Sequence, residues 1–220
     1  MVTYNNLPKI IGFSGKIGSG KTTLAQILCN EYPYTKASFA DPLKYIVQYL
    51  YDLEHNQLYG NKKEIIDTRY GVTPRYLLQY IGTNLFRNWD KNFWVNVFER
   101  KYANQELLVL DDVRFENEAH IIHQMGGIVI KVVSHRVGNN NIDNNNIGNN
   151  NTDQNGINHI PANHESEQGV KNYDYKIYND QGYEELNKSL QELLHYIKTN
   201  NSNNNENNHA DEEHDCHLLH

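Results

Sequence analysis

The chain has 220 residues, which suits one domain of about 100 to 200 residues with added segments and excludes large multidomain motors. Its formal net charge is −7 and no block of Lys or Arg alternates with aromatic residues, so no nucleic-acid partner is expected. With two cysteines, no signal peptide and no long apolar segment, the sequence predicts a cytoplasmic, reduced protein with no membrane partner.

A phosphate-binding loop is the first motif along the chain. Residues 15–22 match G-x-x-x-x-G-K-[ST] in full, after an apolar run at Lys9–Phe13 that predicts a strand and before a helical pattern at Thr22–Glu31. In such a loop, backbone N–H groups surround a di- or triphosphate, Lys21 neutralises charge and the Thr22 hydroxyl binds Mg²⁺. The residues expected to bind the phosphates are Gly15, Lys16, Gly18, Ser19, Gly20, Lys21, Thr22 and Thr23. A dinucleotide site is not supported, because Thr23 stands where the third glycine of that motif would be.

The remaining apolar patterns alternate between strand and helix. The expected elements are a short strand near Lys36–Phe39, a helical middle at Pro42–Ala103, a strand at Leu107–Leu110, a helix at Asn117–Met125, strands at Ile128–Val133 and Tyr175–Tyr178, and a helix at Tyr183–Ile197. This order predicts an α/β fold of three layers, with a central parallel sheet flanked by helices and ligands at the carboxyl ends of the strands.

Two segments are low in complexity. Asparagine makes up about half of residues 139–163 and dominates again at 200–208, and such polar runs bury too little apolar surface to offset the entropy of ordering. We therefore expect one P-loop domain over residues 1–198, a disordered insertion at 139–163 within it, and a disordered Asn- and His-rich tail at 199–220.

Acidic and basic side chains follow the predicted strands and gather at one edge of the sheet. After the loop residues, these are Asp41, Asp111, Asp112, Arg114, His135 and Arg136, and the helical middle adds Arg69, Arg75 and Arg87. A kinase for a small phosphorylated acceptor needs a Mg²⁺ ligand, a carboxylate near the acceptor and several guanidinium groups to hold two anionic reactants together. Arginine suits this role because its planar group pairs with phosphate through two hydrogen bonds.

Five short motifs, in order along the chain, also resemble a known family. They are Phe39–Lys44 (FADPLK), Arg75–Thr83 (RYLLQYIGT), Phe93–Val95 (FWV), Asp112–Ala119 (DVRFENEA) and His164–Glu167 (HESE). Together with the P-loop, they resemble the deoxynucleoside monophosphate kinases of T-even bacteriophages and their relatives in large DNA viruses. The resemblance implies a P-loop NMP-kinase-like fold with a lid, a homodimer, and conversion of a dNMP to a dNDP with ATP and Mg²⁺. The Asn-rich segments are similar to giant-virus proteins in composition, which would place the protein in a host cytoplasm.

The resemblance implies roles for the donor side of the site. Lys21 and Thr22 would bind the ATP phosphates and Mg²⁺, with Asp112 as a further metal-binding residue. Arg136 would belong to the lid, cover the adenine and reach the transferred phosphoryl group. The Asn-rich insertion at 139–163 departs from the family because it occupies this lid region.

The resemblance also implies roles on the acceptor side. Asp41 would lie beside the acceptor phosphate or sugar, Arg75 would hold the monophosphate, and Gln79 would face the base, where its amide both donates and accepts. Further acceptor-side candidates are Lys44, Arg69, Arg87, Trp89 and Arg114. The residues expected to act in catalysis are Lys21, Asp41, Arg75 and Arg136.

Three alternatives remain open from the sequence. A phosphomevalonate-kinase-like enzyme would share the P-loop and the Ala-Asp-Pro motif but would not need the base-facing Gln79. A non-catalytic GTP-binding switch would need an Asn-Lys-x-Asp motif after a late strand, whereas Asn61–Glu64 ends in the wrong acid and lies too early. An ATPase linked to nucleic acid is disfavoured by the negative net charge.

Overall fold

The computed structural model describes residues 7–135 and 169–213, with side chains up to residue 200, and the core of this region is one five-stranded sheet. Its strands are β1 (Ile10–Ser14), β2 (Thr35–Ala37), β3 (Leu108–Val113), β4 (Ile128–Val133) and β5 (Tyr175–Tyr178). The helices are α1 (Lys21–Glu31), α2 (Asp41–Tyr51), α3 (His55–Leu58), the 3₁₀ helix η1 (Asn61–Glu64), α4 (Pro74–Gln79), the π-helix η2 (Tyr80–Arg87), α5 (Phe93–Tyr102), α6 (Glu116–Gln124) and α7 (Tyr183–Glu213).

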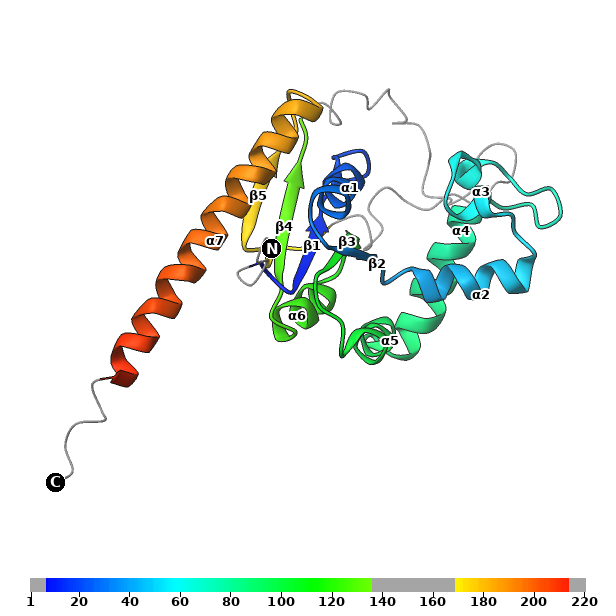
Figure 1. Cartoon of the computed structure of the whole chain (residues 1–220). Helices are drawn as coiled ribbons and strands as arrows, with labels where there is room; N and C mark the ends of the chain where they lie inside the picture. Colours follow the sequence, from blue (N-terminus) through cyan, green and yellow to red (C-terminus); the bar gives the residue numbers. More distant parts are fainter. Residues whose placement is uncertain (1–6, 136–168, 214–220) are drawn as a thin grey trace.

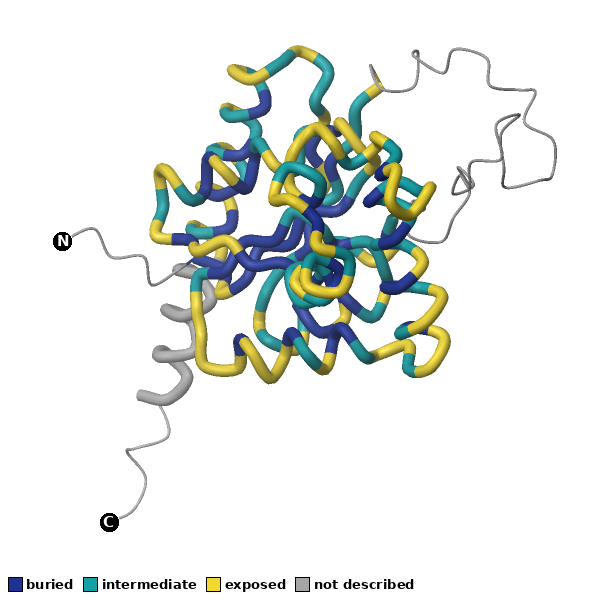
Figure 2. Tube along the Cα trace, turned by 90° about the vertical axis from the view of Figure 1, so that its right-hand side faces the viewer, coloured by how far each residue is buried: buried dark blue, intermediate teal, exposed yellow. Residues whose placement is uncertain are grey.

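The sheet is parallel throughout and has the order β2-β3-β1-β4-β5, with β1 at its centre (Figure 1). Every residue of β1 is buried, as expected for a central parallel strand that is covered by helices on both faces. Successive side chains of the strand point to opposite faces, so Ile11 and Phe13 pack against α1 and α7, whereas Ile10 packs against α5 and α6. Figure 2 shows these strands as the buried centre of the molecule. The predicted three-layer α/β fold is therefore confirmed.

The helices between β2 and β3 carry a separate apolar core. It consists of Leu43, Val47, Leu53, Leu58, Leu77, Ile81 and Trp94. Figure 1 shows α2, α3 and α4 grouped beside β2, on the side of the sheet away from α7. The π-helix η2 packs closely on α2, because a Cβ added at Gly82 would lie 2.6 Å from the Leu43 side chain. The Gly82 carbonyl also accepts a hydrogen bond from Trp94 Nε1 at 2.9 Å, so this region is joined to α5.

The structure differs from the sequence prediction at three places. The helical middle is divided into shorter helices, with a turn at residues 67–72 closed by an antiparallel bridge between Asp67 and Val72. β3 continues to Val113, so Asp111 and Asp112 lie inside the strand and not after it. The last helix continues to Glu213, beyond the expected end at Ile197, because a helix once formed gains one hydrogen bond for each residue added.

Two expectations concern parts of the chain that this structure leaves undescribed. All of the predicted insertion at 139–163 and most of the predicted lid lie outside the described residues, as do residues 214–220 of the tail. In the described part of the chain, no helix combines the length and the apolar character needed to cross a membrane.

Candidate functional site

The phosphate-binding loop joins the end of β1 to the start of α1. Gly20 stands just before the helix with φ +105°, and no side chain caps the first backbone N–H groups of α1. A Cβ added at Gly15 would lie 2.2 Å from the carbonyl oxygen of Val132, so the loop passes close to β4. The result is a helix N-terminus whose N–H groups are available to an anion.

Lys21 lies across this loop. Its Nζ donates hydrogen bonds to the carbonyl oxygens of Gly15 at 2.8 Å and Lys16 at 2.7 Å. The ammonium group is therefore held next to the loop N–H groups, where it can neutralise a phosphate.

Residues after β4 and β5 support the loop from the side. Asn179 Nδ2 donates a hydrogen bond to the backbone carbonyl oxygen of Ser19 at 2.9 Å, and the backbone carbonyl oxygen of Asn179 accepts one from Ser134 Oγ at 2.8 Å. A Cβ added at Gly20 would lie 2.6 Å from Asn179 Nδ2, so the contact is close. The sequence analysis missed Asn179, although it directly follows a predicted strand, which is the same signal that identified the other candidates.

The two adjacent acids of β3 contact different elements, at the point where the register of β3 against β1 shifts. Asp111 follows Val109 on the face covered by α1, where it accepts a hydrogen bond from the Thr22 side chain and pairs with Lys36 at 2.8 Å. These hydrogen bonds lower the pKa of Asp111 against the opposing effect of burial. A hydroxyl and a carboxylate are oxygen ligands of the kind that Mg²⁺ prefers. The residues present therefore fit a Mg²⁺ ion at Thr22 and Asp111.

Asp112 contacts the turn that follows β2. Its Oδ2 accepts hydrogen bonds from Ser38 Oγ at 2.7 Å and from the Ala40 backbone N–H at 3.0 Å. Its Oδ1 is buried without a hydrogen-bond partner among the described residues, and burial raises the pKa of the carboxyl group. The sequence analysis expected Asp112 to bind Mg²⁺, but its contacts instead hold the turn that leads into Asp41 and α2.

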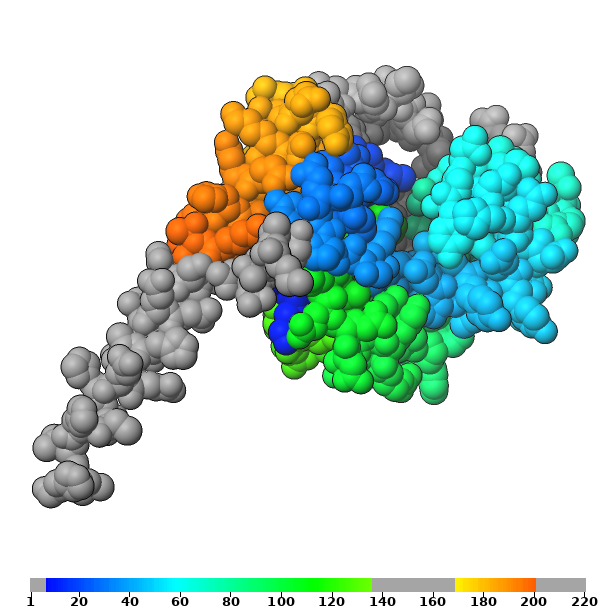
Figure 3. All heavy atoms as spheres, viewed as in Figure 1, coloured from blue at the N-terminus to red at the C-terminus, as the bar shows by residue number. Residues whose placement is uncertain are grey.

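The acceptor-side residues lie across from the P-loop, on the helices between β2 and β3. Figure 3 shows a hollow between the region of α1 and the cyan helices on the right of the view. Arg75 pairs through Nε with Glu64, and Lys44 pairs with Asp41 at 3.4 Å. Lys63 of η1 lies close enough to Lys44, Arg75, Arg114 and Asp111 to interact electrostatically with each of them.

Lys63 is a second residue that the sequence analysis missed. It lies in the segment Asn61–Glu64, which the sequence analysis compared with a guanine-binding motif and rejected. No regular spacing in this short segment indicates where the side chain points, so the sequence gives no sign that Lys44, Arg75 and Arg114 act on Lys63 electrostatically.

Two predicted acceptor-side arginines form contacts with neighbouring side chains of the domain. Arg87 is 8% exposed, pairs with Glu118 at 2.5 Å and lies 3.5 Å from the centre of the Phe115 ring. Arg69 forms two hydrogen bonds to Asp67 at 2.9 and 2.7 Å, which lower the pKa of that carboxyl group. Both guanidinium groups hold the local chain in place, and a role for either residue on the acceptor side stays a prediction.

Three further predicted site residues, one on each of three separate segments, are Gln79, Trp89 and Arg136. Gln79 ends α4, next to the stacked rings of Tyr76 and Tyr80. Trp89 is 76% exposed and contacts Phe93, with 5.8 Å between ring centres. Arg136 lies outside the described residues.

At the base of the predicted lid, His135 is held by the residue that follows Asn179. Its backbone N–H and its Nδ1 both bind the Asp180 carboxylate, at 2.8 and 2.7 Å. The ends of β4 and β5 are thus fixed to each other beside the P-loop.

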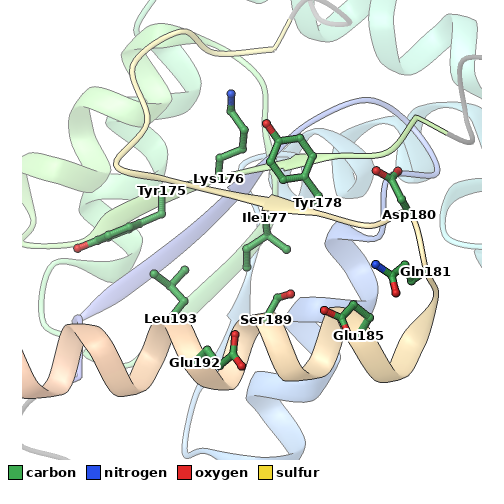
Figure 4. A pocket seen from close by; sticks show the side chains of 10 residues that line it. All are labelled: Tyr175, Lys176, Ile177, Tyr178, Asp180, Gln181, Glu185, Ser189, Glu192 and Leu193. Atoms are coloured by element: carbon green, nitrogen blue, oxygen red, sulfur yellow. The ribbon is translucent and has the colours of Figure 1, made fainter.

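Two hollows are present on the described surface. A groove of about 390 Å³ runs between β5 and α7, where Ile177 points toward the helix and Lys176 and Tyr178 point away from it (Figure 4). None of the P-loop residues lines this groove. A second hollow of about 300 Å³ lies beside α1 and includes Thr22 and Thr23. The second hollow is therefore the one next to the phosphate-binding residues.

Comparison with known proteins points to one family. A family model described as "Deoxynucleotide monophosphate kinase" matches residues 52–190, more than half of the chain. The chain is also 39% identical over 140 residues to a protein of Acanthamoeba polyphaga mimivirus that is named for the same kinase activity, and the match covers 56% of this chain and 72% of that protein.

Among solved structures, the chain is similar to two shikimate kinases. The enzyme from Bacteroides thetaiotaomicron has 13% identity and a TM-score of 0.46, with 86% of this chain and 98% of that chain covered. The enzyme from Aquifex aeolicus has 13% identity and a TM-score of 0.47, with 87% and 97% covered. Both TM-scores are below 0.5, so the fold assignment rests on the order and direction of the strands.

Proposed function

Because the chain belongs to the deoxynucleotide monophosphate kinase family, we propose that it transfers the γ-phosphoryl group of ATP to the 5′-phosphate of a deoxynucleoside monophosphate. An oxygen of the acceptor phosphate forms the new bond to the γ-phosphorus, the bond to the β-phosphate oxygen breaks, and the products are a dNDP and ADP. The observation that carries this proposal is the family match over residues 52–190, which begins after α2 and spans α3, α4 and η2 as well as β3 and β4.

The donor side is assigned to the P-loop. The N–H groups of residues 15–22 and the Lys21 ammonium bind the ATP phosphates, supported by the open first turn of α1. Thr22 and Asp111 hold Mg²⁺, in place of the pair of Thr22 and Asp112 expected from the sequence. When bound, the ion neutralises charge on the transferred phosphoryl group. Arg136 stays a predicted lid residue.

The acceptor side is assigned to residues that face the P-loop from α2, α4 and the end of β3. Arg75 and Arg114 bind the acceptor phosphate, and Asp41 holds Lys44 in position beside it. Gln79 faces the base from the end of α4, and Trp89 is an exposed aromatic residue of the same region. A phosphate acceptor is already ionised near neutral pH, so no strong general base is needed and correct positioning supplies most of the rate.

The proposal is tested by measuring ATP consumption by the purified protein with Mg²⁺. The acceptor panel comprises dTMP, dGMP, dCMP, dUMP and dAMP, the matching ribonucleotides, and mevalonate 5-phosphate. We expect turnover with at least one deoxynucleotide and slower turnover with its ribonucleotide. The ranking of acceptors then identifies the base and the sugar that the site selects.

A pair of lysine variants shows whether the measured turnover belongs to this site. Lys21→Ala removes the P-loop ammonium and is expected to abolish turnover, whereas Lys9→Ala changes an exposed lysine paired with Glu106 and leaves it intact. Turnover with mevalonate 5-phosphate alone, or with no member of the panel, would contradict the proposed acceptor class.

A further inference from the structure

A buried ion pair joins the acceptor-side helices to the turn that follows β3. Arg87 ends η2 and Glu118 lies in the first turn of α6; their side chains are 2.5 Å apart and only 9% and 4% exposed. Removing two charges from water costs free energy that their attraction offsets only in part, and an apolar pair of similar volume often stabilises a protein interior equally well. Stability alone therefore does not account for this pair.

The second oxygen of Glu118 fixes the turn between β3 and α6. Its Oε2 accepts hydrogen bonds from the backbone N–H groups of Arg114 at 2.7 Å and Phe115 at 3.1 Å. The guanidinium carbon of Arg87 lies 3.5 Å from the centre of the Phe115 ring. One carboxylate thus binds Arg87 and also holds the backbone of Arg114.

Asn117, in the same turn of α6, makes this connection a second time. Its Oδ1 accepts a hydrogen bond from Arg87 Nη1 at 3.2 Å. Its Nδ2 donates to the backbone oxygen of Lys91 at 2.8 Å and to the side-chain oxygen of Asn92 at 2.9 Å. Because Lys91 and Asn92 connect η2 to α5, three segments are fixed to one another at this point.

Arg75 lies near the other end of the same helical segment. α4 passes into η2 at Tyr80, whose backbone angles (φ −62°, ψ −51°) are helical, so residues 74–87 form one continuous helix that begins beside Arg75 and ends at Arg87. Groups on helices are held more precisely than groups on loops. Fixing Arg87 to the turn after β3 therefore fixes Arg75 relative to Arg114.

We propose that Arg87 and Glu118 are positioning residues, which set the separation of Arg75 and Arg114 so that both bind one acceptor phosphate. This inference rests on the proposed function, in which those two arginines bind the phosphate. Arg87 then acts through the placement of Arg114 and does not touch the substrate. The geometry matters because a displacement of about 1 Å in a positioning contact can cost about 100-fold in rate.

The test combines Arg87→Met with Arg114→Ala, and the acceptor is the deoxynucleotide with the highest turnover in the panel above. Arg87→Met alone cuts the connection but leaves Glu118 able to hold the turn. It should raise the acceptor KM roughly tenfold to a hundredfold, the range for lost hydrogen bonds between charged groups, with the KM for ATP within about twofold. In a protein that already carries Arg114→Ala, the same change should raise the acceptor KM less than about threefold, because the group that Arg87 positions is absent.

Two further variants separate positioning from stability. Leu194→Ala also destabilises the protein, but it lies in the core cluster on the α1 and α7 face of the sheet and should leave the acceptor KM within about twofold. Arg87→Lys keeps the charge that faces Glu118 but loses the planar group that also reaches Asn117, so its acceptor KM should lie between those of the unmodified protein and Arg87→Met. If Arg87→Met does not fold, Arg87→Lys takes its place in the combination with Arg114→Ala.

The results distinguish a failure of this inference from a failure of the function. In a protein that phosphorylates a deoxynucleotide, an acceptor KM that Arg87 substitution leaves unchanged would overturn the positioning role and leave the function standing. An increase by the same factor with and without Arg114 would do the same, because a purely structural contact does not depend on Arg114. If the unmodified protein phosphorylates none of the deoxynucleotides, the function and the inference both fail.

Discussion

Asp111 and Asp112 are neighbours in sequence, yet their carboxylates contact different elements, at the point where the register of β3 against β1 shifts. Asp111 meets Thr22 on the side of α1, and Asp112 meets Ser38 and Ala40 in the turn before α2. We propose that Asp111 binds the metal ion, whereas the contacts of Asp112 position the start of a helix.

Separate alanine substitutions of the two acids should therefore have different effects. Asp111→Ala should raise the Mg²⁺ concentration needed for half-maximal rate roughly 10- to 100-fold, with little change in stability. Asp112→Ala should lower the free energy of unfolding by about 1–3 kcal/mol, because buried donors of the Ser38–Ala40 turn lose their acceptor. Mg²⁺ titrations of the rate and urea unfolding curves of both variants provide the comparison. The reverse assignment is correct if Asp112→Ala alone shifts the Mg²⁺ response.

Glu118 links stability to pH. Burial raises its pKa from 4.5 to about 7, and the opposing attraction of Arg87 does not cancel this effect. The folded protein therefore keeps this proton to a higher pH than the unfolded chain, so the contribution of Glu118 to the free energy of unfolding falls as pH rises between these values.

Glu118→Gln removes this titration while it keeps a side chain of similar shape. As the pH rises from about 5 to about 7, the free energy of unfolding of the unmodified protein should decrease relative to that of the variant. Urea unfolding of both proteins across this range gives the difference directly. A difference that is constant or grows with pH would show that Glu118 is ionised throughout.

At the scale of elements, residues at the ends of β4 and β5 bind one another and contact the P-loop. Asn179 contacts Ser19, and Asp180 holds His135. Asn179→Ala should raise the KM for ATP roughly threefold to tenfold, the range expected for one neutral hydrogen bond, with the acceptor KM and the melting temperature little changed. Asn172→Ala, in the loop before β5, is the control. Equal KM values for ATP in the two variants would argue against a positioning role for Asn179.

The sequence predicted most elements because their apolar periodicity is strong. β4 and β5 begin and end where expected, and α1 differs by a single residue at its start. β3 was predicted too short because its last residues include two acids, which interrupt an apolar run although the strand pairs with β1 again at Val113. Periodicity reports which side chains are buried, and it misses a strand that carries polar residues.

The site was harder to predict than the fold. The P-loop is a contiguous motif and could be located from the sequence, whereas the face to which Asp111 points depends on where β3 pairs with β1. The burial of Arg87 depends on a partner, Glu118, on another helix. Such contacts depend on tertiary packing, and a single sequence carries no direct signal for them.

At the scale of the whole molecule, α7 has two parts. Among its described side chains, which end at residue 200, the buried apolar residues are Leu186, Leu190, Leu194 and Ile197. From residue 200 to Glu213, where the helix ends, the sequence has Ala210 as its one apolar residue. A chain that stops at Thr199 should therefore keep its activity and melt within about 2 °C of the full chain. In contrast, Leu194→Ala should cost about 2–5 kcal/mol, because it leaves a cavity under the sheet. Thermal unfolding of the two variants makes the comparison, and a large loss on truncation would show that residues beyond 199 stabilise the domain.

The acceptor-side helices pack around Leu43, Val47 and Leu77, apart from the clusters on the two faces of the sheet. Substitutions that are distant and share no partners add independently, so changes in this core need not disturb the packing beneath the P-loop. Natural selection can therefore alter the preferred base or sugar by changing these helices while the ATP-binding half stays constant. Descendants of one ancestral gene could in this way acquire different substrates without first losing their ability to fold.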